Sequence, residues 1–348
     1  MKIVTSLYGD KYLSLLIVFL ASLRKIYSSV EVFVFWSDIE PKLIEPIKNY
    51  FKEGTHFINI KSESLIDNSS QSNYFSAIKS SKVSYFESIY KYIGEDEDLV
   101  FIDTDIILVG EISEVFNSPF DIAFTPLEGV RYKYPVNTGI IFIRHNTVTR
   151  SLIKNMGEHI SNIVLDPVEN RISVERYGGA DQAAFCRVLD YKSDGRIDGH
   201  LVVKDVRKLE VPAAIYNNYE AIENIGETKI IHLKGSWQTI LFSGRSLISI
   251  SNKGDKASFV YKLFLETFIQ TISKIYCEPF LSNHQDKFGV KVPWYFYKNG
   301  DQLIANNAKM IVYQILERIY RYFFNRRVRQ LYAPLGSIIF KKYSFWLQ

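Results

Sequence analysis

Cysteine is scarce in this chain, and its scarcity excludes two kinds of architecture. Among 348 residues only Cys186 and Cys277 are cysteines. Two thiols cannot build a disulfide framework or a zinc ribbon. Because a chain with few cysteines suits a reducing compartment, we expect the protein to work in the cytoplasm. Cys186 falls in an apolar helical segment, so a buried thiol is its expected state.

The chain also has little hydrophobic sequence of membrane-spanning length. The apolar run at 12–23 covers about 12 residues, whereas a span needs roughly 20, and Arg24 and Lys25 follow it directly. Met1 and Lys2 lead straight into an apolar segment, without the pattern of a cleaved leader. A buried helix is the preferred interpretation of this run, and a signal anchor is the alternative.

Negative charge is nearly absent beyond residue 308. Residues 309–348 contain eight Lys and Arg and one acidic residue, Glu317, so their net charge is +7. Because the whole chain has a net charge of +4, residues 1–308 have a net charge of −3. Basic residues interleaved with aromatic ones suit the headgroup zone of an anionic membrane. This tail therefore predicts a membrane partner. A helical lid on the body is the structural alternative, and nucleic acid is not expected because no binding motif for it is present.

The composition otherwise matches a soluble globular protein, with 47% apolar and 23% charged residues. Short apolar segments typical of strands alternate with helical patterns through the first part of the chain. The expected strands are 2–7, 30–36, 55–60 and 99–102, and the expected helices are 11–27, 41–51 and 76–92. This alternation predicts an α/β fold whose mainly parallel sheet is flanked by helices. Ligands of such sheets bind beyond the carboxyl ends of the strands.

The same patterns continue less regularly through the rest of the chain. Strands are expected at 139–143 and 229–233, and helices at 149–160, after Gly179, and at 257–276. Isoleucines at 311, 315 and 319 recur at the spacing of an amphipathic helix.

Two carboxylates follow one of the expected strands. Asp103 and Asp105 flank Thr104 and would repel each other unless a cation or a proton lies between them. A hard divalent ion such as Mg²⁺ or Mn²⁺ is held by carboxylates of this kind together with substrate phosphates. The pair therefore predicts a metal–diphosphate site, and a solvated turn capped by Asp103 is the equally compatible alternative.

Three other polar segments lie at strand ends or helix starts. Asn137 and Thr138 precede an expected strand, Asp181 and Gln182 follow two glycines before a helix, and His232 ends a strand. With the Asp pair, they occur in the order FIDTDIILVG, VNTGIIFIR, GGADQAAF and IIHLKGSW. In these motifs the chain resembles glycosyltransferases of the GT-A fold, most closely those of family 8.

The resemblance covers residues 2–238 and implies an organisation as well as an activity. It implies a GT-A catalytic domain over 1–250, with a Rossmann-like sheet that binds a nucleotide-diphospho-sugar. The remaining residues, 251–348, are expected to form a helical extension that carries the basic, aromatic tail.

The resemblance also assigns roles to particular residues. Asp103, Asp105 and His232 look like the ligands of a Mn²⁺ or Mg²⁺ ion, and Gln182 and Asp181 look like the pair that contacts the reacting sugar. The residues implied in holding the donor are Thr5, Leu7 and Tyr8 near the base, Lys79, Lys82, Lys234 and Gly235 near the phosphates, and Asp103, Thr104, Asp105, Asn137 and Thr138 around the diphosphate and sugar.

The chain departs from the family pattern at several positions. Gln238 stands where relatives usually offer a lysine to the diphosphate, and Lys234 or Lys79 is the hypothetical replacement. Thr138 stands in place of an alanine, and Ala183 in place of a further acidic residue. Donor identity and stereochemistry therefore do not transfer with the resemblance.

Two stereochemical courses stay open at this stage. Retention is the expected one, with the acceptor attacking on the face of the leaving phosphate and Gln182 too weak to act as a nucleophile. Inversion would need a general base, for which Asp181 is the first candidate and Asp166 the second.

The expected function is metal-dependent transfer of a sugar from a nucleotide-diphosphate donor, by resemblance a UDP-sugar, to a glycan or glycolipid. Surface polysaccharide or lipopolysaccharide synthesis of the bacterial type, at the inner face of the cytoplasmic membrane, is the expected setting. One alternative is a haloacid-dehalogenase-like, Mg-dependent phosphatase, whose Asp-x-Asp also follows an apolar strand. Another is a non-catalytic glycan-binding or membrane-adaptor protein on the same fold.

Overall fold

The computed structural model describes most of the first two thirds of the chain and short parts of the rest. The described residues are 1–60, 88–94, 97–127, 134–218, 226–233, 255–276, 296–299 and 302–305. The chain divides into two compact units, Met1–Leu233 and Lys234–Gln348. The domain boundary expected at residue 250 lies among residues outside the described part, so it stays a prediction.

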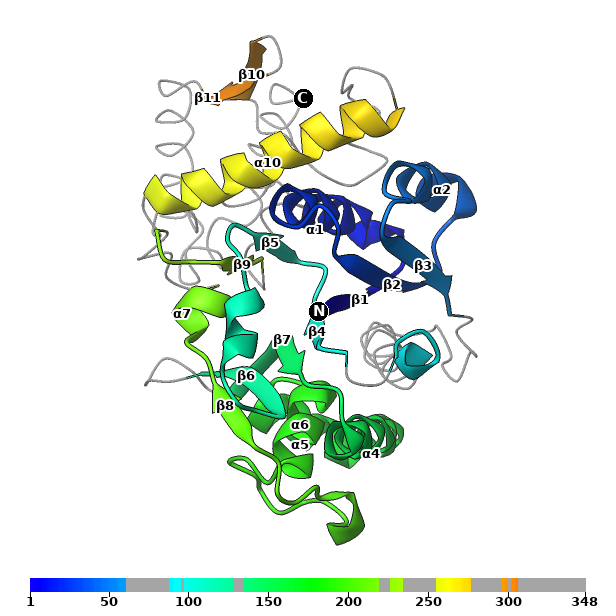
Figure 1. Cartoon of the computed structure of the whole chain (residues 1–348), viewed down its shortest axis with the longest axis vertical. Helices are drawn as coiled ribbons and strands as arrows, with labels where there is room; N and C mark the ends of the chain where they lie inside the picture. The colour runs from blue at the N-terminus through cyan, green and yellow to red at the C-terminus, as the bar shows by residue number, and fades with distance from the viewer. Residues whose placement is uncertain are drawn as a thin grey trace, which may run out of the picture. The chain divides into compact units, whose positions relative to one another are not determined.

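Parallel strands form one half of the central sheet (Figure 1). β1 (Lys2–Tyr8) pairs in parallel with both β2 (Glu31–Ser37) and β4 (Leu99–Ile102), and β3 (Thr55–Asn59) pairs in parallel with β2. All residues of β2 except the first are buried, as a nearly continuous apolar run predicts for a strand covered on both faces.

An antiparallel strand joins this half of the sheet to the other. β7 (Val136–Ile143) runs antiparallel between β4 and β6 (Ile122–Pro126), and β8 (Lys208–Glu210) pairs in parallel with β6 at the edge. The strand order is β3-β2-β1-β4-β7-β6-β8. The expected mainly parallel sheet flanked by helices is thus confirmed, and β7 is the strand whose direction the sequence did not reveal.

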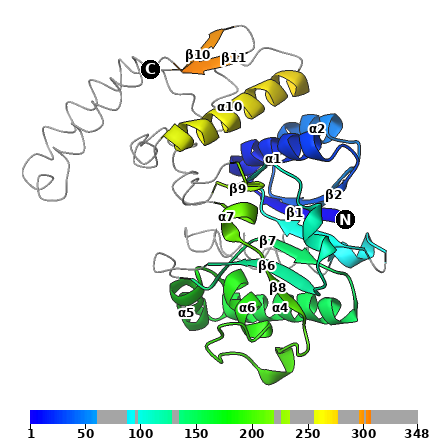
Figure 2. The same cartoon turned by 60° about the vertical axis from the view of Figure 1, so that its left-hand side comes forward.

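Helices cover both faces of the sheet. α1 (Leu13–Ile26) and α2 (Pro41–Tyr50) lie on one side, and α4 (Thr147–Leu165), α5 (Pro167–Tyr177) and α6 (Ala180–Val188) lie on the other, as Figures 1 and 2 show from two directions. The core between the sheet and α4 and α6 is built from aromatic and aliphatic side chains of these elements.

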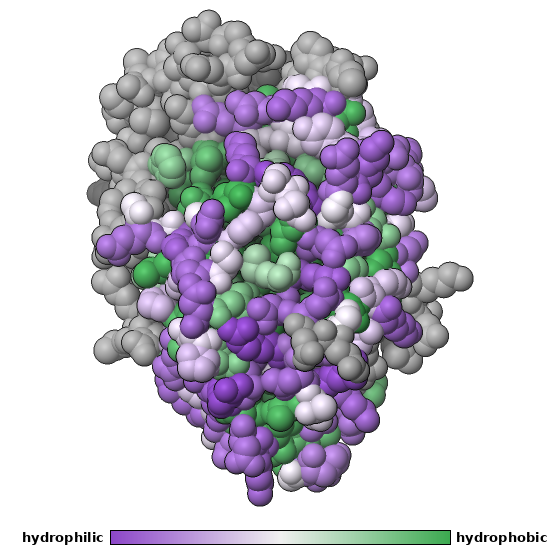
Figure 3. Space-filling model, in the orientation of Figure 1, coloured by the Kyte–Doolittle hydropathy of each residue, from purple (hydrophilic) through white to green (hydrophobic). Residues whose placement is uncertain are grey.

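The apolar run at 12–23 forms a buried helix, as expected. Most of its apolar side chains are inaccessible to solvent: Leu13, Leu15, Leu16, Ile17, Val18, Phe19, Leu20 and Leu23. Among the described residues, no helix is both long enough and apolar enough to cross a membrane. On the face drawn in Figure 3, hydrophilic side chains are spread among small hydrophobic areas.

A second, two-stranded sheet lies apart from the main one. β5 (Ile106–Leu108) pairs antiparallel with β9 (Ile230–His232), so His232 is the direct partner of Ile106. The segment after the Asp pair was not expected to form a strand, because three residues are too few to show a period.

Two further expectations need correction. β7 begins at Val136, so Asn137 and Thr138 lie inside the strand and not before it. The helix α5 was not expected, and Asp166 is its N-cap: one carboxylate oxygen accepts from the amides of Val168 at 2.8 Å and Glu169 at 3.1 Å. This capping gives Asp166 a structural role at the start of α5.

The second unit contains the helix expected at 257–276, observed as α10 (Asp255–Tyr276). Its apolar residues at four-residue spacing, Val260, Phe264, Phe268 and Ile272, are buried. β10 (Phe296–Asn299) and β11 (Gln302–Ala305) pair as an antiparallel hairpin. The expected helix near 311–323 lies outside the described residues, as does most of the one expected at 76–92.

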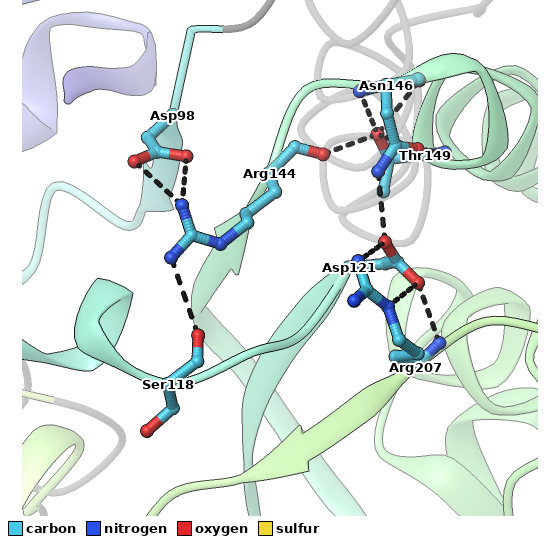
Figure 4. A network of polar contacts seen from close by, with 7 residues as sticks. All are labelled: Asp98, Ser118, Asp121, Arg144, Asn146, Thr149 and Arg207. Atoms are coloured by element: carbon cyan, nitrogen blue, oxygen red, sulfur yellow. Dashed lines mark hydrogen bonds and ion pairs between the residues drawn. The ribbon is translucent and has the colours of Figure 1, made fainter.

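A polar network fastens the edge strand β8 to the sheet (Figure 4). The Asp121 carboxylate accepts hydrogen bonds from Arg207 Nη2 at 2.8 Å, from the Arg207 amide at 2.9 Å and from Asn146 Nδ2 at 3.0 Å. Asn146 also caps α4 through a reciprocal pair of bonds with Thr149. Arg207 holds the pKa of Asp121 at about 2, despite the opposing effect of burial.

Replacing Asp121 by Asn tests this network. Because the folded pKa lies below the value of about 3.9 in an unfolded chain, the ionised carboxylate stabilises the fold above that value and less so as pH falls. We expect Asp121→Asn to lower the free energy of unfolding by about 2 kcal/mol at about pH 7. Urea unfolding should show the difference in the free energy of unfolding between variant and wild type narrowing from about pH 5 down to about pH 2. A gap independent of pH would contradict the assignment.

Candidate functional site

Three potential metal ligands meet at the end of β4. One ligand atom from each of Asp103, Asp105 and His232 lies within 4.8 Å of those of the other two. His232 Nε2 is 3.1 Å from Asp105 Oδ1, and the His232 side chain is 2% exposed while that of Asp105 is 14% exposed. The structure thus brings together the three residues that the family resemblance assigned to one ion.

The small sheet explains how residues so distant in sequence become neighbours. The carboxylates lie between β4 and β5, and β5 pairs with β9, whose last residue is His232. The Leu233 amide donates to the Asp105 carbonyl at 2.7 Å, and the Asp103 amide donates to the Gly139 carbonyl at 2.9 Å. Backbone hydrogen bonds on both sides therefore hold the Asp pair in place.

Gly139 leaves room for the imidazole ring. A Cβ atom at this position would lie 2.4 Å from His232 Cε1 and 2.8 Å from Asn137 Oδ1. No side chain fits there without displacing the histidine. The glycine of the VNTGIIFIR motif is thus explained by a close contact between the β7 backbone and the ring.

The remaining ring nitrogen of His232 is held by a residue that the sequence analysis missed. His232 Nδ1 is 2.7 Å from Asn217 Oδ1, and both side chains are buried. Asn217 follows the short helix α7 (Ala213–Tyr216) and belongs to none of the recognised motifs. Nothing in the sequence singles out this asparagine, because it lies well before β9 (Ile230–His232) and outside any motif.

The donor set fits a divalent cation of the harder kind. Two carboxylates and one imidazole supply two oxygens and one nitrogen, which suits Mn²⁺ or Mg²⁺ with phosphate oxygens completing the shell. Oxygen ligands of Mg²⁺ lie about 2.1 Å from the ion, so two of them are at most about 4.2 Å apart. The three ligand atoms lie within 4.8 Å of one another, so small side-chain rotations would allow all three residues to share one ion.

A second group of polar side chains comes from β7 and the start of α6. The Thr138 hydroxyl donates to Asp181 Oδ2 at 2.7 Å, which joins the two elements. Asn137 is 2% exposed, and its Oδ1 accepts from the Gly139 amide at 2.7 Å. Its Nδ2 is buried and has no hydrogen-bond partner among the described residues.

Gln182 presents a matching unsatisfied acceptor. Its Nε2 donates to the Tyr177 carbonyl at 2.5 Å, whereas its Oε1 is buried without a hydrogen-bond partner in the described part of the chain. Gly178 has φ of +82°, and a Cβ there would lie 2.7 Å from Gln182 Nε2. Glycine at this turn is therefore required both by its left-handed backbone and by the space that Gln182 occupies.

A buried ion cluster supports the turn before Gln182. Arg187 is fully buried and pairs with Asp194 at 2.8 Å and Glu169 at 3.0 Å, with its guanidinium 5.6 Å from the Tyr177 ring. The cluster links α5, α6 and the loop after α6 beside Tyr177, whose carbonyl accepts the hydrogen bond from Gln182. Burial, followed by the Arg187 charge, lowers the pKa of nearby His159 to about 4.

The residues expected near the nucleotide base lie along β1. Thr5 and Leu7 are buried, and Thr5 Oγ1 has no hydrogen-bond partner among the described residues. Burial, with a hydrogen bond to Asp38, raises the pKa of Tyr8. Burial and the charge of Asp105 raise the pKa of Tyr12, which places this tyrosine near the Asp pair although the sequence analysis did not select it.

Several expected site residues lie outside the described part of the chain. These are Lys79, Lys82, Lys234 and Gly235, together with Gln238, which stands where the family usually has a lysine. Thr104 lies between the two carboxylates and is partly exposed. Cys186 is fully buried, as expected, and burial raises the pKa of its thiol to about 12.

Comparison of the chain with protein-family models and with curated proteins gives no match. Among solved structures it is similar to the glycosyltransferase GlyE of Streptococcus pneumoniae TIGR4, with a TM-score of 0.49 and 15% identity over 79% of this chain and 63% of GlyE. The galactosyltransferase LgtC, solved with donor and acceptor sugar analogs, has a TM-score of 0.41 and 12% identity over 68% of this chain and 87% of LgtC.

The bifunctional glycosyltransferase WbbM is similar with a TM-score of 0.46 and 12% identity, over 80% of this chain and 51% of WbbM. The chain thus spans less than two thirds of the length of GlyE and of WbbM. All three of these structures are of glycosyltransferases. At these identities and TM-scores the likeness carries no conclusion about donor, acceptor or mechanism, which have to be argued from the chain's own residues.

Substitution of one carboxylate tests the metal site. We expect Asp105→Asn to weaken Mn²⁺ binding by at least about 100-fold, since loss of a supporting residue alone costs 10–100-fold. Isothermal titration or Mn²⁺ electron paramagnetic resonance measures the affinity. Asp205→Asn is the matched control, because Asp205 is exposed and its φ of 59° is one that asparagine also adopts. Equal Mn²⁺ affinity in both variants would refute the site.

Proposed function

We propose that this protein is a metal-dependent glycosyltransferase that uses a nucleotide-diphosphate sugar, with a UDP-sugar as the donor. The observation that supports it most is the convergence of Asp103, Asp105 and His232 at the end of β4. A glycan or lipid-linked acceptor completes the proposed reaction. Surface polysaccharide or lipopolysaccharide synthesis of the bacterial type is its proposed setting.

The charge arrangement suits the departure of a diphosphate. Breaking the bond between the anomeric carbon and the β-phosphate builds negative charge on the phosphate. A divalent cation bound there acts as a Lewis acid for the leaving group. Asp103, Asp105 and His232 would hold that cation. Main-chain hydrogen bonds to β7 and between β5 and β9 fix the positions of these three residues before the donor binds. Such preorganised charge is the main contribution expected of the protein.

The two unsatisfied amide atoms suit a polyhydroxylated ligand. Asn137 Nδ2 is a buried donor and Gln182 Oε1 a buried acceptor, each without a hydrogen-bond partner among the described residues. Leaving such atoms unpaired costs about 1–3 kcal/mol each. Sugar hydroxyls both donate and accept, so a bound sugar would satisfy both atoms. The other polar atom of each amide is already hydrogen-bonded: Asn137 Oδ1 accepts from the Gly139 amide, and Gln182 Nε2 donates to the Tyr177 carbonyl. These bonds orient both side chains before a ligand binds.

The surroundings of Asp181 and Gln182 favour transfer with retention of configuration. One oxygen of the Asp181 carboxylate accepts from the Thr138 hydroxyl, an arrangement suited to orienting a sugar hydroxyl rather than removing a proton. Gln182 carries a neutral amide oxygen, a weak nucleophile. The acceptor hydroxyl would attack the anomeric carbon on the face that the diphosphate leaves, and its proton would pass to an oxygen of the departing phosphate. This step needs only positioning and stabilisation of the leaving group. Gln182 Oε1 would stabilise the positive charge that develops on the sugar.

A donor-hydrolysis screen tests the proposed activity. UDP-, GDP- and dTDP-sugars are incubated with the full chain, with and without Mn²⁺, and the released nucleotide is measured. We expect Mn²⁺-dependent release from a UDP-sugar, abolition by Asp105→Ala, and a loss of about 100-fold in Gln182→Ala, the cost of removing one stabilising polar group. Asn155→Ala, which removes an amide that bonds the Leu201 carbonyl, is the matched control.

Three other outcomes would contradict parts of this proposal. Release of inorganic phosphate from simple phosphate esters would favour the phosphatase alternative. A rise in melting temperature with Mn²⁺ and UDP, without turnover of any sugar nucleotide, would favour a binding protein on the same fold. An inverted anomeric configuration in the product, read by proton NMR, would overturn retention and return Asp181 to the role of base.

We also propose that the tail at 309–348 brings the enzyme to the inner face of the cytoplasmic membrane. Support comes from its net charge of +7, since each basic residue near an anionic surface contributes about 1 kcal/mol. The full chain should sediment with anionic liposomes at low salt, and a chain ending at residue 308 should not. Neutral liposomes are the control, and equal sedimentation of both chains would refute the proposal.

A further inference from the structure

His232 is held through both of its ring nitrogens. Nε2 faces Asp105 Oδ1 at 3.1 Å, and Nδ1 lies 2.7 Å from Asn217 Oδ1 on the opposite side of the ring. Only one of the two nitrogens carries the proton of a neutral imidazole, and a metal ion binds the other. Which nitrogen Asn217 leaves available therefore decides whether His232 can serve as a ligand beside the carboxylates.

The orientation of the Asn217 amide follows from its neighbours. The Thr125 hydroxyl donates to the Asn137 carbonyl at 3.2 Å, so its lone pairs remain to accept from Asn217 Nδ2 at 2.7 Å. With Nδ2 directed at Thr125, the other amide atom, Oδ1, faces the imidazole. An amide oxygen can only accept, so Nδ1 of His232 has to carry the proton.

The backbone of Asn217 is fixed on both sides. Its amide donates to the Ala213 carbonyl at 2.9 Å, which closes α7. The next residue, Asn218, accepts from the His232 amide at 2.9 Å and donates to the Ile230 carbonyl at 3.0 Å, so the segment runs as a parallel bridge beside β9. Asn217 and His232 are thus held at a constant separation by main-chain hydrogen bonds.

The chain of bonds is fully enclosed. Asn217 and Thr125 are completely buried, and His232 and Asn137 are each 2% exposed. Water therefore does not compete for these groups, and each hydrogen bond in the chain depends on the orientation of the next. The chain runs from the imidazole through the asparagine and threonine to the carbonyl of Asn137, whose side chain carries the unpaired Nδ2.

We propose that Asn217 is a positioning residue for the metal site: through Thr125 it fixes the proton of neutral His232 on Nδ1 and leaves Nε2 to bind the cation. This inference rests on the proposed metal site. Residues that fix metal-binding histidines in this way commonly contribute 10–100-fold to metal affinity. Asn217 is not one of the three candidate ligands, and its side chain contacts them through the His232 imidazole.

The proton position can be measured in the metal-free protein. Long-range proton–nitrogen NMR spectra of ¹⁵N-histidine-labelled full chain, recorded above the pH at which the imidazoles are protonated, distinguish the two neutral forms of each ring. The His232 signals are identified by their loss in His232→Gln. We expect wild type to show His232 protonated at Nδ1. Absence of a proton from Nδ1 would overturn the proposal, because it would mean that the Asn217 amide is turned the other way.

Two substitutions at Asn217 separate orientation from packing. Asn217→Leu removes the acceptor and should move the His232 proton to Nε2 or give a mixture, with Mn²⁺ affinity reduced about 10–100-fold. Asn217→Asp keeps an acceptor facing Nδ1 and should keep the wild-type form. Asn218→Leu is the matched control, since this buried amide bonds Thr228 Oγ1 at 2.9 Å and not the histidine ring.

The outcomes distinguish this inference from the proposed function. A proton that stays on Nδ1 in a folded Asn217→Leu protein would refute the role of Asn217. If the leucine variant does not fold, loss of the proton from Nδ1 of His232 in Asn217→Asp would refute it equally. If wild type shows Nδ1 protonation but binds no Mn²⁺, the proposed metal function fails while the assignment of Asn217 stands.

Discussion

The antiparallel pairing of β5 with β9 is the contact on which the candidate site depends. It places the final residue of β9 against the segment that follows Asp103 and Asp105, so that an imidazole stands beside two carboxylates at the end of a buried strand. The Asp103 amide is bound to the β7 backbone in turn. Three separate parts of the chain thus define one point through main-chain hydrogen bonds, whose geometry varies little with side-chain motion.

Around that point the fold leaves some polar atoms unsatisfied and satisfies others completely. The ring nitrogen of His232 that faces away from the carboxylates lies in a closed chain of hydrogen bonds, whereas Asn137 Nδ2 and Gln182 Oε1 are buried without a hydrogen-bond partner in the described region. Folding rarely leaves such atoms unpaired, since each costs free energy. The contrast separates groups that hold the site together from groups suited to meet a ligand.

Two glycines show how closely the backbone approaches these groups. Gly139 lies against the His232 ring, and Gly178 combines a left-handed φ with contact to the Gln182 amide. In the sequence both positions are recognisable only as members of short motifs. The reasons for them differ: space for a ring at the first, and backbone conformation together with space at the second. The first reason depends on His232, which lies far from Gly139 in the sequence.

The sequence by itself determined the alternating strands and helices, the buried helix at 13–26, and the residue types of the site, because apolar periodicity and motifs such as Asp-x-Asp are local properties. Tertiary structure alone decided the antiparallel direction of β7, the pairing of β5 with β9, and the contact between Asn217 and His232. These features arise between segments that are separated in the sequence. A strand of three residues is also too short for its sequence pattern to predict which strand it pairs with. A buried asparagine outside any motif becomes meaningful only once its neighbour is known.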